Sequence, residues 1–227
     1  MREVFPNIYL LEIPLPENPL RALNSYIIAG KDRNLVIDTG FNRLECKDAL
    51  SQGLVASGID LKKTALVITH AHTDHAGLAG DFAQQGFEVF MGEVDAQIMN
   101  ASSQISYWER IENSIRSFGL EADNISFSRF PGFKFSPHAI INFSCLKEGD
   151  QISLGEYNFQ VIDIPGHSPG HIGLYEKQHR LFFCGDHILD KITPNIGFWG
   201  PEHGDMLGTY LQSLRKISAI EIDYLFP

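Results

Sequence analysis

The sequence predicts an α/β domain whose helices lie outside layers of β-sheet. Short apolar runs separated by turns open the chain, and helical stretches alternate with further strands after residue 40. A continuous apolar run at residues 65–68 is typical of a strand that is buried on both faces. Helices placed between such strands are expected to cover the outer faces of the sheets, because each sheet must bury its apolar sides.

The first ninety residues alternate between turns and apolar runs. Runs bounded by turn residues predict strands at Ile8–Ile13, Leu23–Ala29, Leu35–Ile37, Ala65–Ile68 and Phe87–Met91. Two helices are expected between the later strands. One lies near Arg43–Ser57, where Gly58 can cap the end, and the other at about Ala76–Gln85, before Gly86.

The rest of the chain begins with a long periodic stretch. Apolar residues at steps of three, four or seven predict one helix over Glu93–Phe118, and the irregular stretch Leu120–Ile141 predicts a loop. The elements expected after it are strands and one helix: Gln151–Leu154, Asn158–Ile164, His171–Tyr175, Arg180–Cys184, the amphipathic helix Asp205–Ser218 and the strand Ile222–Phe226. No linker or repeat divides the chain, so we expect a single domain over residues 1–227 with a helical and loop insertion at about 93–141.

Composition narrows the expected partners and compartment. Eighteen basic against 28 acidic residues give a net charge of −10, so no nucleic-acid partner is expected. No apolar run approaches the roughly 18–20 residues that span a bilayer, and the first residues carry no export pattern, so we expect no membrane association and a cytoplasmic location. The cysteines (Cys46, Cys145 and Cys184) are far apart, which argues against a disulfide framework. A small molecule remains as the expected partner, and Cys184 is expected to be a buried structural thiol.

The strongest motif follows the buried strand Ala65–Ile68 directly. In the run Thr69–His75, residues two apart in an extended segment point to one side, so His70 and His72 can reach one cation. Asp74 and His75 follow as the chain turns and could serve a second cation. Imidazole and carboxylate together suit zinc, manganese or iron(II), so the sequence predicts a metal site here.

Two later segments add ligand candidates. His167 follows the predicted strand Asn158–Ile164, and Asp186 follows the predicted strand Arg180–Cys184. Ligands of α/β sheets gather beyond the carboxyl ends of strands, which is where both residues stand. Either segment alone is weak, because Gly-His and Gly-Asp are common turn dipeptides; their order after the histidine-rich motif gives them weight.

In these motifs the sequence resembles the metallo-β-lactamase superfamily. The His-x-His-x-Asp-His motif, the Gly-His turn, the Gly-Asp turn and the hairpin that ends in residues 36–40 occur in that family's order, so the resemblance covers nearly the whole chain. It implies a four-layer αββα sandwich, with two mixed β-sheets face to face and helices outside. It also implies a binuclear metal site. In the family's pattern the first metal is held by His70, His72 and His167, the second by Asp74 and His75, and Asp186 bridges the two.

One element of the family's pattern is missing from this chain. The family's last ligand is a histidine in a turn after a final strand, whereas here the sequence stops at Pro227. We therefore expect that this chain is truncated just before that turn and that its second metal site is the weaker of the two. His203 could substitute, although it precedes the last predicted helix.

The resemblance favours a zinc-dependent hydrolase. One or two zinc ions would activate hydroxide to attack a small ester, thioester, lactone or amide, and Asp74 would orient the hydroxide and carry a proton to the leaving group. Iron or manganese would also suit the ligands. The alternatives are an iron-dependent oxidoreductase of the same fold, which oxidises sulfur compounds, and a metal-binding domain without turnover.

Several other residues could support the site. Asp38 is the candidate acceptor for the second ring nitrogen of a metal-binding histidine, or else a simple turn residue. His171 and His187 are expected either behind the ligands, in the pocket wall, or on the surface, and His138 and His179 are expected to be structural. Aromatic residues in the stretches 93–141 and 192–203 could line a substrate pocket, although Trp108 fits the core stripe of its helix.

Overall fold

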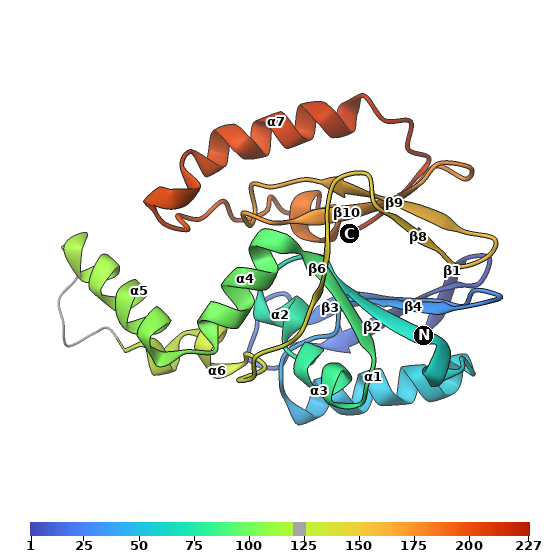
Figure 1. Ribbon diagram of the computed structural model, residues 1–227, viewed down its shortest axis with the longest axis horizontal. Coiled ribbons are helices and arrows are strands. Elements are labelled where there is room, and N and C mark those ends of the chain that lie inside the picture. The colour runs from blue at the N-terminus through green and yellow to red at the C-terminus, as the bar shows by residue number, and fades with distance from the viewer. Residues whose placement is uncertain (120–125) are drawn as a thin grey trace.

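The computed structural model describes residues 1–119 and 126–227, and it places two β-sheets face to face with helices on both outer sides (Figure 1). This is the four-layer αββα arrangement that the resemblance to the metallo-β-lactamase superfamily implies, and it confirms the predicted α/β class. The predicted loop Leu120–Ile141 falls in part on residues 120–125, which lie outside the described residues.

The first sheet has seven strands in the order of the sequence. They are β1 (Arg2–Phe5), β2 (Ile8–Pro14), β3 (Ala22–Ile28), β4 (Asn34–Ile37), β5 (Thr64–Ile68), β6 (Glu88–Gly92) and β7 (Ser144–Leu146). Strands β1 to β4 pair antiparallel, and β4 to β7 pair parallel. Parallel neighbours need crossover connections, and helices supply them between β4 and β6.

The second sheet has five strands in the order β12-β11-β10-β9-β8. They are β8 (Gln151–Ser153), β9 (Asn158–Asp163), β10 (Ile172–Glu176), β11 (Leu181–Phe183) and β12 (Tyr224–Phe226). Only β11 and β12 pair parallel, so this sheet is mixed like the first.

The main core lies between the two sheets. Alternate residues of the central strands, such as Ile37 and Val67, face inward and pack with Phe159 and Phe183 of the second sheet. Residues on the other face of the same strands, such as Leu66, pack against the helices below. This explains why β5 has the continuous apolar sequence of a strand buried on both faces.

Helices cover both outer faces of the sandwich (Figure 1). The first sheet is covered by α1 (Leu44–Ser57), α2 (Thr73–Ala76), α3 (Ala79–Gln84) and α4 (Glu93–Ser102), and the second by α7 (Met206–Ser218). Helices α5 (Ile105–Ser117) and α6 (Pro131–Lys134) lie beside α4 at one end of the molecule. None of the helices in the described ranges combines the length and the apolar character that a bilayer crossing requires.

The prediction of one continuous helix over Glu93–Phe118 was wrong. The structure ends α4 at Ser102 and starts α5 at Ile105, with extended backbone at Gln104 (φ −97°, ψ 136°). The indole nitrogen of Trp108 donates to the carbonyl oxygen of Ser102 over 2.6 Å, and this side-chain bond satisfies a carbonyl at the end of α4. The break thus carries a side-chain-to-backbone bond between residues six apart, which apolar periodicity cannot reveal.

Three smaller differences concern short elements. The predicted helix Ala76–Gln85 is two short helices: α2 ends at Ala76 and already contains His75, and α3 covers Ala79–Gln84. Helix α6 forms within the predicted loop, where Pro131 occupies the first helical position. The edge strands β1 and β7 were not predicted, because runs of four and three residues are too short to show a period.

Candidate metal centre

Three loops bring the predicted ligands to one edge of the sandwich. His70 and His72 follow the end of β5, His167 lies between β9 and β10, and Asp186 follows β11. We call these segments, residues 69–75, 165–171 and 185–187, the ligand loops. The two sheets thus contribute to one site, although the residues lie up to 116 positions apart (70 to 186).

The first group of facing ligand atoms consists of three histidines. Ring nitrogens of His70, His72 and His167 all lie within 4.8 Å of one another. His72 Nδ1 is 3.1 Å from His70 Nε2 and 2.8 Å from His167 Nε2. Three imidazole nitrogens converging in this way fit a zinc ion or another divalent metal.

The outer nitrogens of two of these rings are already engaged. His167 Nδ1 donates to the carbonyl oxygen of Asn195 over 2.8 Å. His70 Nδ1 lies 3.0 Å from Thr69 Oγ1, whose hydroxyl donates to Asp38 Oδ2 over 2.8 Å and so accepts from His70. Both Nε2 atoms therefore present lone pairs, and a single N–H on His72 cannot satisfy both of them.

The second group combines His70 with His75 and Asp186. His75 Nδ1 donates to Asp38 Oδ2 over 2.8 Å, as expected for Asp38, so His75 Nε2 presents a lone pair when the ring is neutral. That nitrogen lies 3.2 Å from Asp186 Oδ1, while Asp186 Oδ2 lies 3.5 Å from His167 Nε2. One carboxylate therefore stands between the two groups, which is where a ligand shared by two cations would lie.

The electrostatics of the groups follow from their burial. Burial lowers the pKa of His70 and His72, to about 3 for His72, so these imidazoles are neutral at neutral pH. Burial opposes the charge on His75 too, but the carboxylates of Asp186 and Asp38 hold its pKa well above the usual value. A proton or a cation is therefore needed between His75 and Asp186.

Asp38 is positioned by an unusual backbone conformation. Its φ is +59°, in the left-handed region that Asp tolerates better than most residues. The Asp38 carboxylate accepts hydrogen bonds from His75 Nδ1 and from the Thr69 hydroxyl. It also accepts one from the backbone N–H of Thr69 over 2.8 Å. Asp38 thus fixes the first ligand loop at its start and orients His75 within it.

Asp95 is a supporting residue that sequence reasoning missed. It is fully buried in the first turn of α4, and it accepts from the N–H of Ala71 (2.8 Å), the hydroxyl of Ser168 (2.5 Å) and the N–H of Gly170 (2.6 Å). Burial raises the pKa of this carboxyl to about 6, although the three hydrogen bonds lower it in part. Asp95 therefore joins the first two ligand loops. Its only sequence signal was an acidic residue in a helical first turn, which is common.

The other predicted residues lie close by. Asp74 belongs to neither group; it is half-buried and lines the hollow that also holds His72. His171 is buried and its ring stacks on that of His70, with centroids 4.6 Å apart. His187 is buried behind it, and its two ring nitrogens have no hydrogen-bond partner among the described residues. His203 lies in neither ligand group.

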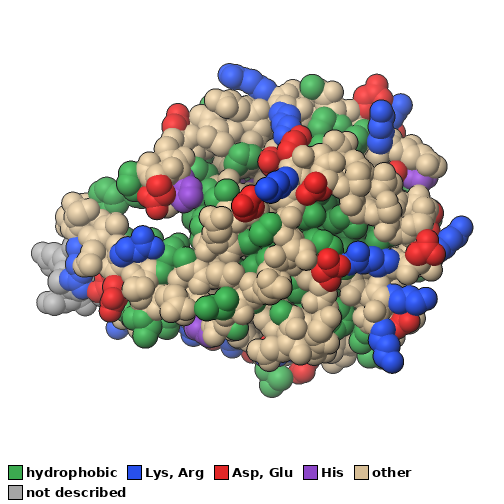
Figure 2. Space-filling view, viewed as in Figure 1, with side chains coloured by type: hydrophobic (Ala, Val, Ile, Leu, Met, Phe, Trp, Pro, Cys, Tyr) green, Lys and Arg blue, Asp and Glu red, His purple; other side chains and the backbone are tan. Residues whose placement is uncertain are grey.

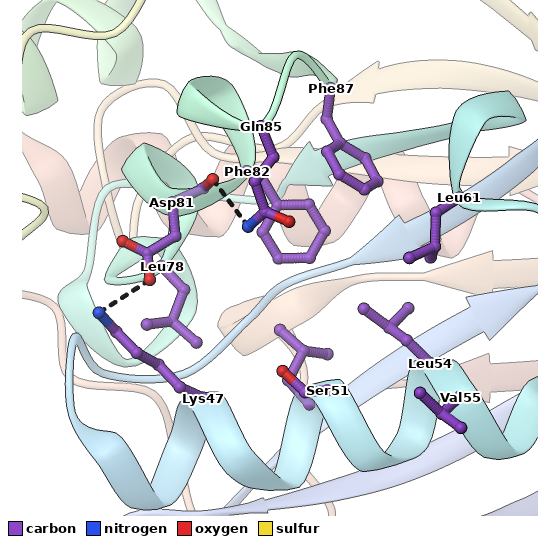
Figure 3. Close-up of a pocket in the computed structure, with 11 residues that line it drawn as sticks. Lys47, Ser51, Leu54, Val55, Leu61, Leu78, Asp81, Phe82, Gln85 and Phe87 are labelled. Carbon is purple, nitrogen blue, oxygen red and sulfur yellow. Dashed lines mark hydrogen bonds and ion pairs between the residues drawn. The ribbon is translucent and has the colours of Figure 1, made fainter.

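Two other side chains singled out in the sequence, Cys184 and Trp108, are buried. Burial raises the pKa of Cys184 to about 12, so it is a structural thiol. A separate hollow between α1 and α3 is lined mainly by apolar residues, and its charged residues Lys47 and Asp81 pair with each other over 2.8 Å (Figure 3). It contains none of the ligand residues, so the chemistry belongs to the ligand loops.

Comparison with known proteins agrees with this arrangement. A model of the metallo-beta-lactamase superfamily matches residues 19–227. An acyl-coenzyme A thioesterase named MBLAC2, from Gallus gallus, is 30% identical over 173 residues, which are 74% of this chain and 58% of the relative. A hydroxyacylglutathione hydrolase named GloC, from Haemophilus influenzae, is 30% identical over 56% of this chain and 51% of its own length. The chain thus spans between half and three fifths of these relatives.

Solved structures share the fold. A metallo-beta-lactamase family protein from Thermus thermophilus superimposes with a TM-score of 0.78 at 26% identity, covering 95% of this chain and 71% of the other. The match extends over both sheets, since it includes nearly the whole chain.

Proposed function

Because the chain belongs to the metallo-beta-lactamase superfamily, we propose that it is a zinc-dependent hydrolase of small thioesters. The observation that carries this proposal is the convergence of three imidazole nitrogens, those of His70, His72 and His167, beside the carboxylate of Asp186, which also faces His75. The names of two relatives support a thioester as the substrate. One is named an acyl-coenzyme A thioesterase and the other a hydroxyacylglutathione hydrolase, and both of these substrates join an acyl group to sulfur.

The proposed roles follow the two groups. His70, His72 and His167 of the first group would hold the first zinc ion as neutral ligands, and Asp186 of the second group would bridge it to a second ion at His75. Asp74, which lies in neither group, is the further ligand of the second ion that the family's pattern implies. When bound, zinc acidifies a water molecule and neutralises charge that develops on a carbonyl oxygen. Asp38 keeps His75 Nε2 directed at the site through the hydrogen bond to Nδ1.

Asp74 is the proposed proton carrier. It lines both the hollow that contains His72 and the neighbouring hollow that contains His75 and Asp186. From there it would accept the proton that water loses as its oxygen bonds to the thioester carbon. It would return a proton to the thiolate as the carbon–sulfur bond breaks, giving one carboxylic acid and one thiol.

A panel assay with matched variants tests the proposal. The zinc-loaded chain is offered acyl thioesters, esters, lactones and amides, and bound metal is measured by mass spectrometry. We expect thioester hydrolysis that is lost in His72→Ala together with zinc, and retained in His179→Ala, whose histidine pairs with Glu176 outside the site.

The outcomes separate the candidate functions. A chain that holds zinc and cleaves no thioester contradicts the proposal. Iron with a visible absorbance, in protein expressed without added metal, would favour the oxidoreductase, and metal without turnover would favour a binding domain.

A further inference from the structure

A large cavity opens beside the metal centre, between helices α4 and α5 and residues 198–203. Its volume is about 630 Å³, within the range of small-molecule sites. In Figure 2 the surface is notched on the left, between the part that carries α5 and the part that carries the start of α7, and hydrophobic side chains lie along the notch. We call this cavity between α4, α5 and residues 198–203 the tail cavity. We propose that it holds the apolar acyl chain of the substrate, an inference that rests on the proposed thioesterase function.

The walls of the tail cavity are largely apolar. Helices α4 and α5 contribute Ile98, Ile111 and Ile115. Phe118 directly follows α5, and its ring faces Phe198. The rings of Phe118 and Phe198 meet edge to face with centroids 5.8 Å apart, yet 68% of Phe118 and 63% of Phe198 are exposed. Large apolar side chains that gather while exposed mark a surface that an apolar ligand can cover.

The tail cavity adjoins the hollow at the metal centre, and the two share wall residues. Ile98, Tyr107 and Trp199 line it and also line the smaller hollow, of about 190 Å³, that contains His72 and Asp74. The Trp199 ring lies 5.3 Å from the His72 ring, and its Nε1 donates to the carbonyl oxygen of His167 over 3.1 Å. A molecule whose carbonyl lies beside His72 can therefore extend its chain past Trp199.

The chemistry of the walls selects the class of occupant. A sugar or peptide would need several polar partners held inside the cavity, whereas most of the lining side chains are apolar and the polar ones, Gln97, Asn113, Ser114 and His203 among them, are exposed or half-buried. The charged residues in the lining, such as Arg110 and Glu202, are exposed. A saturated acyl chain of medium length needs none of these partners, so it fits best.

A chain-length series tests the inference. The zinc-loaded chain is assayed with N-acetylcysteamine thioesters from acetyl to decanoyl, which share one small thiol. We expect kcat/KM to rise about fourfold with each added methylene until the cavity is filled, a factor that corresponds to about 0.8 kcal/mol. Ile115→Asn is expected to lower the decanoyl-to-acetyl ratio at least about tenfold. The matched control Val55→Asn, at a residue 81% exposed on α1, is expected to keep the ratio of the unmodified chain.

A binding measurement works without turnover. Dodecanoate is titrated into the metal-free chain by calorimetry, and we expect binding at one site that Ile115→Asn weakens about tenfold. If acetyl and decanoyl thioesters react equally, the tail inference is wrong and the hydrolase proposal stands. If no thioester reacts, the proposed function is wrong, and dodecanoate then decides about the cavity: no binding, or equal binding by Ile115→Asn, overturns it.

Discussion

The ligand loops and the tail cavity are neighbours built on opposite physical principles. In the ligand loops, buried polar groups fix one another: Asp38 holds Thr69 and His75, and Asp95 joins two loops. In the tail cavity, half-exposed apolar side chains line an open space. Directional bonds fix atoms to within fractions of an ångström, whereas apolar contact depends mainly on area. The comparison suggests that the loops determine the reaction and the cavity determines which acyl chain is bound.

The largest expected effect is the loss of a ligand. His167→Ala removes one of three converging imidazoles, and we expect zinc affinity to fall more than about 100-fold. The loss of a residue that only hydrogen-bonds to a ligand usually lowers metal affinity by about 10- to 100-fold. Phe198→Ala, in the tail cavity, is expected to bind zinc as the unmodified chain does. Competition with a chelator measures both, and equal affinities in the two variants would remove the distinction between the regions.

The second effect concerns the residue that joins the loops. In Asp95→Asn an amide N–H₂ replaces one of the two acceptor oxygens, so at least one buried donor loses its partner. We expect the free energy of unfolding to drop by about 2–3 kcal/mol and zinc affinity to drop about tenfold. Urea unfolding and chelator competition measure the two quantities.

A half-buried aspartate near the surface provides the control for Asp95. Asp81 pairs with Lys47 at the surface, so Asp81→Asn should change stability by no more than about 0.5 kcal/mol. If the two variants lose the same stability, Asp95 does not join the loops in the way described.

The smallest effect is expected where the two regions meet. Trp199→Phe keeps an aromatic ring but loses the hydrogen bond to His167, which should weaken zinc binding a few-fold, in line with about 1 kcal/mol. Trp108→Phe loses a comparable bond to Ser102 and should lower stability without changing zinc affinity. Zinc affinity that is unchanged in both variants would show that Trp199 is not coupled to the ligands.

The sequence predicted the ligand loops better than the cavity for a physical reason. His70, Asp38 and Asp186 follow strands whose apolar pattern is strong, so strand order together with the resemblance to the metallo-β-lactamase pattern indicated one edge for them. Asp95 was missed because nothing in a helical first turn says that the side chain points inward. Its role depends on Ser168 and Gly170, more than seventy positions away.

The cavity walls depend on contacts that no local pattern encodes. The break between α4 and α5, which the sequence did not predict, turns α5 away from the line of α4, and the tail cavity lies between these helices and residues 198–203. The aromatic stretches were expected to line a pocket or to pack in the core. Trp108 is buried and also lines the hollow that holds His72 and Asp74, whereas Phe198 lines the tail cavity and Trp199 lines both.

Anomalous diffraction at the zinc absorption edge, from crystals grown with zinc, tests the central claim most directly. We predict one peak about 2.0–2.1 Å from a ring nitrogen of each of His70, His72 and His167, and a second, weaker one beside His75 and Asp186. Zinc bound only elsewhere on the chain, with the three imidazoles left free, would contradict it.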